Sequence, residues 1–233
     1  IENIIRENLT LYFELETHPV IFENRELLEK MIQAKFLRYT MGCESGSNSL
    51  LKRMGRNSNS RQIIGSVKRI VESGGIVLTS WISNLPGESD SEFKETQDLM
   101  YNVVKVGGFI YWIENLHVLP GSQLYEKPQS WDIEVLLNNL EDWIRWSIFS
   151  KKYVNFDEVY KEPLNYLTHL NRNVSPKEMI DRFYSNRKLA FSLTPEMKSN
   201  LKNRFKNLNS DIVETEMQAL DWYEKEGWTL WLF

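Results

Sequence analysis

Four short stretches of this chain combine carboxylates with glycine or proline, the residue types from which ligand sites at chain turns are often built. They are Glu16-Thr17-His18-Pro19, Gly42-Cys43-Glu44-Ser45-Gly46-Ser47, Asn84-Leu85-Pro86-Gly87-Glu88 and Leu119-Pro120-Gly121. A carboxylate accepts hydrogen bonds from the hydroxyl or ammonium groups of a ligand, and glycine lets the backbone approach a ligand closely. The stretches fit ordinary turn glycines and solvated acids equally well, so their spacing alone leaves both interpretations open.

Each stretch follows a segment with the composition of a β-strand, over residues 11–15, 36–42, 76–82 and 109–118. Helical patterns separate these segments, at residues 24–34, from about residue 60 to 71, and from a Ser89/Glu92 capping box to about residue 105. Strands and helices that alternate predict a parallel βα sheet or barrel. Because ligands bind at the carboxyl ends of such strands, we expect the four stretches to meet at one edge.

Beyond Pro128 the sequence predicts helices and no further strand. Ser175-Pro176 with Glu178 and, in part, Thr194-Pro195 have the form of helix starts. This region carries most of the tryptophans, namely Trp131, Trp143, Trp146, Trp222, Trp228 and Trp231. We expect them to pack against the sheet, because large aromatic side chains dominate core energetics. Two domains are predicted, over residues 1–126 and 127–233.

Composition limits the partners. The 28 basic and 32 acidic residues give a net charge of −4, so no basic field for nucleic acid or an anionic membrane is present. There is no apolar run of the roughly 20 residues that span a bilayer and no signal-peptide pattern, so a cytoplasmic location is expected. The predicted partners are a small molecule or a peptide. The start at Ile1, close to the first strand, suggests a piece of a longer protein.

Cys43 is the single cysteine of the chain. An internal disulfide is therefore excluded, and so is a metal site built from several cysteines of this chain. No metal-ligating residue is predicted, and Cys43 is expected to be a small buried residue.

The motifs taken together resemble a known superfamily. Gly42-Cys43-Glu44-Ser45-Gly46-Ser47 with Leu51 and Met54-Gly55-Arg56, and Leu85-Pro86-Gly87-Glu88-Ser89 with Phe93 and Thr96, resemble a motif pair of radical S-adenosylmethionine (SAM) proteins. The branch that they resemble has an amino-terminal cobalamin-binding domain and includes relatives of the anaerobic magnesium-protoporphyrin ester cyclase. Glu16 to Pro19 and Leu119 to Tyr125 resemble two further motifs of that branch. The resemblance covers about residues 10 to 126, and the tail matches no family.

The resemblance implies an α/β fold that supplies the last four strands of a (βα)6 half-barrel, a partial TIM barrel, followed by a helical tail. In the family a C-x-x-x-C-x-x-C motif holds a 4Fe-4S cluster, which cleaves SAM to a 5′-deoxyadenosyl radical. The cluster ligands would then lie outside this chain, in an amino-terminal half of the same protein. Cobalamin, in a domain that also lies outside, would be a further cofactor of a methyltransferase or cyclase.

The resemblance also implies cofactor-binding residues. Glu44 and Ser45 would contact the ribose or methionine part of SAM, with Glu16 nearby as a second acceptor. The turn of Asn84, Leu85, Pro86 and Gly87 would follow the adenine or ribose through its backbone. Asn84 departs from the pattern, because the family usually has glycine there, although asparagine tolerates left-handed backbone conformations. No catalytic residue can be named.

Two alternatives remain open. The chain is either part of an enzyme, inactive by itself because it lacks the cluster motif, or a non-catalytic degenerate barrel whose tryptophan-rich tail binds a protein or peptide. A metal-independent βα-barrel lyase is disfavoured, because the four strand ends contain no lysine. Trp81 and Trp112, on neighbouring strands, fit either face of the sheet.

Overall fold

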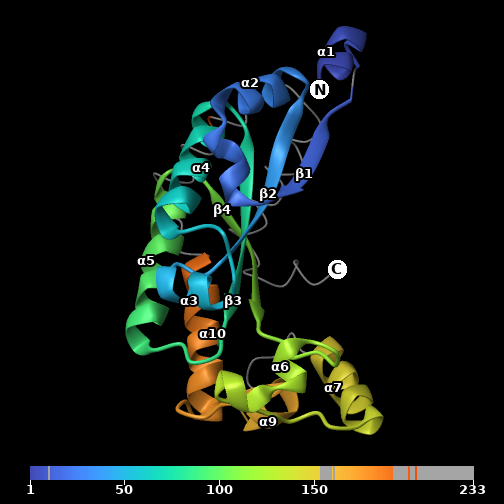
Figure 1. The fold of residues 1–233 in the computed structure, drawn as a ribbon, viewed down its shortest axis with the longest axis vertical. Coiled ribbons are helices and arrows are strands. Elements are labelled where there is room, and N and C mark those ends of the chain that lie inside the picture. Colours follow the sequence, from blue (N-terminus) through green and yellow to red (C-terminus); the bar gives the residue numbers. More distant parts are fainter. Residues whose placement is uncertain (10, 153–158, 160, 191–198, 200–202, 204–233) are drawn as a thin grey trace.

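Four parallel strands form the main sheet, in the order β1-β2-β3-β4 (Figure 1). The computed structural model describes residues 1–9, 11–152, 159, 161–190, 199 and 203. The strands are β1 (Phe13–Thr17), β2 (Phe36–Glu44), β3 (Ile76–Ser83) and β4 (Phe109–Asn115). The predicted α/β class and parallel arrangement are confirmed, and the sheet is consistent with part of a radical SAM barrel.

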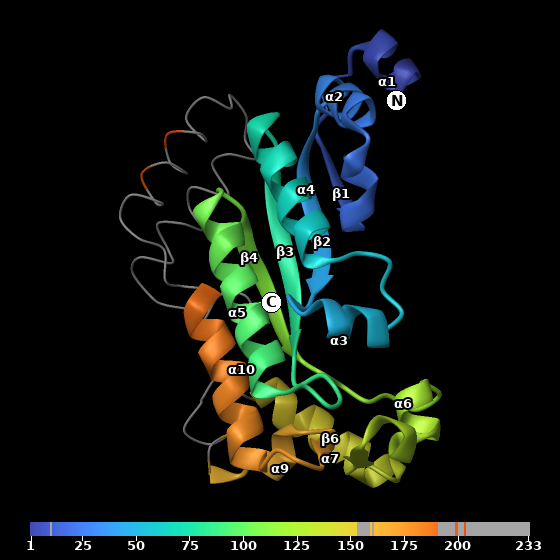
Figure 2. The ribbon, with the colours of Figure 1, turned by 60° about the vertical axis from the view of Figure 1, so that its left-hand side comes forward.

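Helices connect the strands and cover one face of the sheet (Figure 2). They are α2 (Arg25–Gln33), α4 (Ser60–Glu72) and α5 (Asp90–Lys105), and α10 (Pro176–Ala190) lies beside α5 against β4. Shorter elements are α1 (Glu2–Glu7), the 3-10 turn η1 (Pro19–Glu23) and α3 (Asn48–Arg53). We call the side of the sheet that faces away from α4, α5 and α10 the second face.

The main core lies between the sheet and these helices. Tyr39, Met41 and Cys43 of β2 are fully buried there, beside Trp81 of β3. The Trp81 indole N–H donates to Thr79 Oγ1 at 2.9 Å, so its polar atom is satisfied inside the core. Trp112 of β4 is 36% exposed and pairs with Ser80, which places it on the second face. The two tryptophans therefore take opposite faces.

The predicted capping box of Ser89 and Glu92 is confirmed at the start of α5. The structure has a second capping box, of Asn59 and Gln62, at the start of α4. In each, the side chain at the first position accepts from a backbone N–H that the helix itself leaves unpaired. Ser175 caps α10 in the same way, since its Oγ accepts from the N–H of Glu178.

The region after β4 contains two strands that the sequence did not predict. Its elements are α6 (Gln123–Glu126), η2 (Pro128–Trp131), β5 (Ile133–Val135), α7 (Leu140–Lys152), α9 (Pro163–Tyr166) and β6 (His169–Asn171). Strands β5 and β6 pair antiparallel, which corrects the prediction of a strand-free tail. Three-residue strands are too short for an alternation pattern to identify them. The predicted helix start at Thr194-Pro195 and Trp222, Trp228 and Trp231 lie outside the described residues.

A second core joins this region to the sheet. Leu167, Met179, Ile180 and Phe183 are buried in it, and Ile113 of β4 packs against both cores. Within the described ranges, none of the helices combines the length and apolarity of a bilayer-spanning segment.

Candidate functional site

Glu44 lies at the carboxyl end of β2, with its side chain folded back over the strand. The backbone of Glu44 has a φ of 63°, a conformation that few side chains other than asparagine and aspartate adopt readily. Glu44 Oε1 lies 3.3 Å from Nη2 of Arg56, and the same nitrogen donates to the carbonyl of Gly42 at 2.9 Å. Arg56 thus fixes the carboxylate relative to the strand.

Gly42 makes room for this arrangement. A Cβ atom at position 42 would lie 2.6 Å from Glu44 Oε1 and 3.3 Å from Arg56 Nη2. Real Cβ atoms do not approach oxygen that closely, so any other residue would displace the carboxylate. The position without a side chain is on the second face, because Tyr39, Met41 and Cys43 are buried on the helical side.

The Glu44 side chain is 17% exposed. Burial raises the pKa of its carboxyl group, and the positive charge of Arg56 lowers it in part. His18, after β1, has a pKa lowered by burial and by the same arginine. A carboxylate that is oriented, half-buried and reachable from the second face can accept hydrogen bonds from hydroxyl or ammonium groups of a ligand.

Ser45 and Ser47, which follow Glu44, face protein partners. Both serines are fully buried. The Ser45 hydroxyl lies 3.0 Å from Thr96 Oγ1 on α5, which also accepts from the N–H of Gly46 at 3.0 Å. The loop therefore binds helix α5, and Ser45 uses its hydroxyl to hold the backbone beside Glu44.

The turn after β3 is tied to α3. Arg53 donates to the carbonyl of Gly87 at 3.2 Å and to the carboxylate of Glu92 at 3.3 Å. Ser49 donates to the same carboxylate. The loops after β2 and β3 thus share one polar network at the carboxyl edge of the sheet.

Asn84 is fully buried under the tail, with a φ of 64°. Its Nδ2 donates to Asn115 Oδ1 at 2.7 Å and to the carbonyl of Met179 at 2.8 Å. Its own carbonyl lies 3.3 Å from His169 Nε2 and accepts from Asn171 at 3.4 Å. The asparagine that stands in place of glycine therefore has a structural partner in the tail.

Arg182 of α10 holds the last part of this turn. It donates to the carbonyl of Glu88 at 2.9 Å and to the carboxylates of Asp90 and Glu178 at 2.6 and 2.9 Å, and it lies over the ring of Phe93. Its separation from the Glu88 carboxylate is 4.0 Å. Burial raises the pKa of Glu88 to about 7, since this long ion pair offsets only part of the desolvation.

The predicted site residues differ in what they expose. Glu16 is exposed at the end of β1 and pairs in register with Thr40 of β2. Leu85 is buried, Pro86 is half-buried, and Gly87 is exposed with a φ of 67°. Of the predicted side chains, Glu16 and Glu44 present carboxylates, whereas those of Ser45 and Asn84 bond to protein.

Three residues that position this edge were not predicted to do so. Arg56 belongs to the same motif as Glu44, so the spacing of the two residues could have indicated their contact. Thr96 was also in a motif, but its contact to Ser45 spans 51 positions. Arg182 gave no signal, because its bond to Glu88 spans 94 positions and depends on how the tail folds back.

The described residues do not fit an iron–sulfur cluster. Cys43 is fully buried in the core, and burial raises the pKa of its thiol well above the ordinary value, which disfavours the thiolate that a metal needs. Across the part of the chain that the structure describes, no three His, Cys, Asp or Glu side chains are grouped to hold a metal ion.

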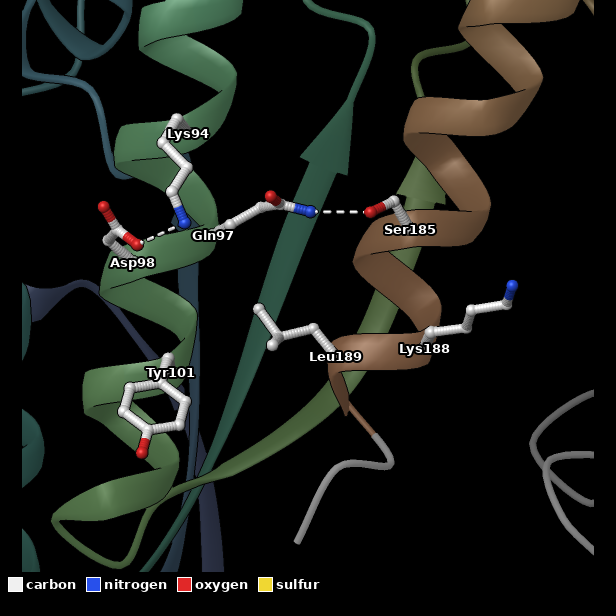
Figure 3. Close-up of a pocket in the computed structure, with 7 residues that line it drawn as sticks. All are labelled: Lys94, Gln97, Asp98, Tyr101, Ser185, Lys188 and Leu189. Atoms are coloured by element: carbon white, nitrogen blue, oxygen red, sulfur yellow. Dashed lines mark hydrogen bonds and ion pairs between the residues drawn. The ribbon is translucent and has the colours of Figure 1, made fainter.

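A groove of about 340 Å³ lies elsewhere, between α5 and α10 on the helical side (Figure 3). Gln97 donates to Ser185 across it at 2.8 Å, and Lys94 pairs with Asp98 on its α5 wall. Neither Glu44 nor Arg56 lines this groove. The chemistry at the carboxyl edge and the groove are therefore separate features.

Comparison with known proteins relates the amino-terminal part of the chain to one superfamily. Residues 1–100 match the family model for the Radical SAM superfamily. A stretch of 115 residues is 27% identical to a tRNA-2-methylthio-N(6)-dimethylallyladenosine synthase of Symbiobacterium thermophilum, covering 47% of this chain and 24% of the relative. A stretch of 69 residues is 44% identical to the ribosomal protein uS12 methylthiotransferase RimO of Clostridium botulinum, covering 28% and 16%.

A RimO protein of Thermosipho africanus is 33% identical over 91 residues, which cover 37% of this chain and 21% of the relative. The matched part therefore spans about a quarter or less of each relative's length. These relatives carry methylthiotransferase and synthase names, whereas the sequence motifs had suggested a cyclase-like branch with cobalamin.

Proposed function

Because residues 1–100, which carry strands β1 to β3, belong to the radical SAM superfamily, we propose that this chain forms the SAM-facing carboxyl edge of a radical SAM enzyme. The observation that carries the proposal is the Glu44 carboxylate, fixed by Arg56 above Gly42 at the end of a parallel strand. Ligands of parallel βα folds bind at that edge. The family match includes all three of these residues.

The chain's own residues would orient the cofactor. Glu44 would accept hydrogen bonds from the ribose hydroxyls or the ammonium group of SAM, and exposed Glu16 would serve as a second acceptor. Leu85, Pro86 and Gly87 would approach the adenine or ribose through the backbone. Ser45 and Asn84 would act indirectly, by holding Glu44 and the turn after β3 in place.

A 4Fe-4S cluster with bound SAM would supply reductive cleavage of SAM to a 5′-deoxyadenosyl radical. The described residues do not fit the cluster, so its thiolates must come from other sequence of the same protein. We expect a C-x-x-x-C-x-x-C motif roughly 80 residues before Ile1 in the source gene, a spacing estimated from the length of two βα units.

For the reaction outcome we propose transfer of a methylthio group, because the relatives are named for methylthio products. A cobalamin-dependent methyltransferase or cyclase is the alternative that the sequence motifs favoured. Cobalt in the purified intact protein would favour the alternative. A sulfur-containing product without cobalt would favour methylthio transfer.

The test is anaerobic SAM cleavage by the intact protein and by a Glu44→Gln variant, which keeps the shape of the side chain and removes its charge. Loss of one charge-assisted hydrogen bond corresponds to about ten-fold weaker SAM binding. We therefore expect the KM for SAM to rise about ten-fold in the variant. Circular dichroism should show that the variant folds as the wild type does. Glu14→Gln is the matched control, since Glu14 lies on the same face near the start of β1.

Unchanged release of 5′-deoxyadenosine by Glu44→Gln would refute the assignment of the site. If the wild-type protein has no cluster motif and cleaves no SAM, the enzyme proposal fails. The non-catalytic binding module would then be the remaining function.

A further inference from the structure

A second group of chemically competent side chains lies at the carboxyl end of β4 and is not used by the site above. It consists of Trp112 and Glu114 on β4, His117 in the following loop, and Trp143 and Trp146 on α7. We call these five residues the aromatic cluster. Trp112 and Glu114 pair with Ser80 and Ile82 of β3, so both project from the second face.

The five side chains form a series of contacts. The indole of Trp112 donates a hydrogen bond to the Glu114 carboxylate. Glu114 Oε1 lies 3.5 Å from His117 Nε2, and the His117 ring meets Trp146 edge-on at 4.8 Å between centroids. Trp146 meets Trp143 in the same manner at 5.7 Å. The Glu114 carboxylate therefore links the ring of Trp112 to a row of three rings formed by His117, Trp146 and Trp143.

Hydrogen bonds to the tail hold the cluster in shape. The N–H of Val118 donates to Thr168 Oγ1 at 2.9 Å, which fixes the loop that carries His117. The indole N–H of Trp146 donates to the carbonyl of Tyr166 at 2.9 Å. The rings are therefore oriented before any ligand arrives, which lowers the entropic cost of binding.

The carboxylate and one indole ring of the cluster are the parts that a ligand can reach, because Trp112 is 36% exposed. Among the residues that the structure describes, Nε2 of His117 and the indole N–H of Trp143 are enclosed by protein and make no hydrogen bond, so the 3.5 Å approach of His117 to Glu114 is a contact only. The Glu114 side chain is 32% exposed and that of His117 is 25% exposed. Burial raises the pKa of Glu114, and the Trp112 bond and the charge of Arg187 on α10 lower it in part.

These properties define the ligand's chemistry. A carboxylate beside an exposed indole ring can bind a cation, because ion pairing with the carboxylate and cation–π attraction to the ring can act together. Arginine and lysine side chains of a peptide carry such a cation on an apolar stem, which suits a half-buried carboxylate beside an indole ring. The net charge of −4 gives no electrostatic support for a nucleic acid.

We infer that the aromatic cluster binds a cationic side chain of a peptide, through Glu114 and the indole ring of Trp112. Its position at the same edge as Glu44 makes it a substrate subsite. That role rests on the proposed function, whereas binding by itself does not.

Binding is tested on the full chain labelled with 5-fluorotryptophan, without SAM or cluster. The probes are N-acetyl-arginine amide and N-acetyl-lysine amide, which separate guanidinium from ammonium sources. We expect at least one of them to shift the fluorine signals of Trp112 and Trp146 in a saturable way. Glu114→Gln should weaken that binding by about ten-fold or more, and Trp112→Leu should weaken it as well.

Glu134→Gln is the matched control, because Glu134 is an exposed acid on β5 of the same tail, and it should leave the affinity unchanged. Fluorine signals from the other tryptophans report whether each variant still folds. The inference is overturned if neither cation binds, if adenosine binds in their place, or if binding persists undiminished in Glu114→Gln. This binding experiment needs no SAM cleavage. The cation site can therefore be refuted while the proposed function holds, and the proposed function can be refuted while the cation site holds.

Discussion

At the scale of single residues, two glutamates at the same edge of the sheet have different environments. Glu44 keeps part of its carboxylate exposed and has Arg56 at 3.3 Å. Glu88 is 4% exposed, and its nearest cation, Arg182, is 4.0 Å away. Desolvation therefore dominates at Glu88 and raises its pKa to about 7.

This shift has a consequence for stability. The carboxyl has a pKa of 4.5 in the unfolded chain and of about 7 in the folded protein. Its contribution to stability is therefore fully present below pH 4.5. The contribution is lost as the pH rises through 7. We expect Glu88→Gln to remove this dependence, so that the variant is more stable than wild type at pH 8 by up to about 3 kcal/mol. Urea unfolding across this range measures it.

Exposed Glu134→Gln serves as the control and should follow the wild-type pH profile. Parallel pH profiles for wild type and Glu88→Gln would contradict the shifted pKa. A loss of stability at neutral and alkaline pH would instead indicate that Glu88 acts as a charged partner of Arg182.

At the scale of elements, the loop after β2 is shaped by its contact with α5. Gly46 has no side chain because α5 passes directly beside it. A Cβ at that position would lie 2.5 Å from the carbonyl oxygen of Glu95 and 2.6 Å from the Cα of Thr96. Both are backbone atoms and cannot move without shifting the helix.

We therefore expect Gly46→Ala to destabilise the protein by about 3 kcal/mol, the cost of an overpacked site. Gly65→Ala, inside α4, is the matched control. The nearest atom to its Cβ would be the end of Arg69 at 3.4 Å, so alanine should stabilise α4 by about 0.5–1 kcal/mol. Thermal unfolding of both variants gives the comparison, and equal effects would argue against the close packing of the loop on α5.

At the scale of the whole molecule, the tail and the sheet form one structure through α10. Arg182 is 7% exposed and donates to the turn after β3, to α5 and to its own helix. Asn84 is bound from the other side by Met179 and Asn171. We propose that this turn lies along the adenine or ribose of SAM. Its shape is therefore set by residues that are far away in the sequence.

Arg182→Lys should loosen this connection, because one ammonium group cannot reproduce the separate bonds of the guanidinium. We expect a loss of about 2 kcal/mol in the free energy of unfolding, with faster amide exchange in the turn from Asn84 to Glu88. Arg172→Lys is the control, since Arg172 is 55% exposed in its ion pair and should change stability by less than about 0.5 kcal/mol. Unchanged exchange in Arg182→Lys would show that the tail does not support the turn.

Local patterns in the sequence determined the parallel sheet, its three connecting helices, the capping box at Ser89 and the helix cap at Ser175. Such features depend on residues that are close in the chain, so local composition and the spacing of apolar residues predict them directly. The same holds for Glu16 and Glu44, whose place at the ends of their strands follows from the strand-like segments directly before them.

The tertiary structure alone decided the rest. Trp81 and Trp112 could not be assigned to a face, because strand alternation does not say which face the helices cover, and the bulge in the pairing of β3 with β4 alters the register. The strands β5 and β6 arise from pairing between distant segments. The Ser45 hydroxyl was expected at the ligand, yet it bonds to Thr96, and the side chain of Asn84, whose backbone was expected there, is bound by Met179. Contacts of this kind form only when the chain folds back, so no local pattern encodes them.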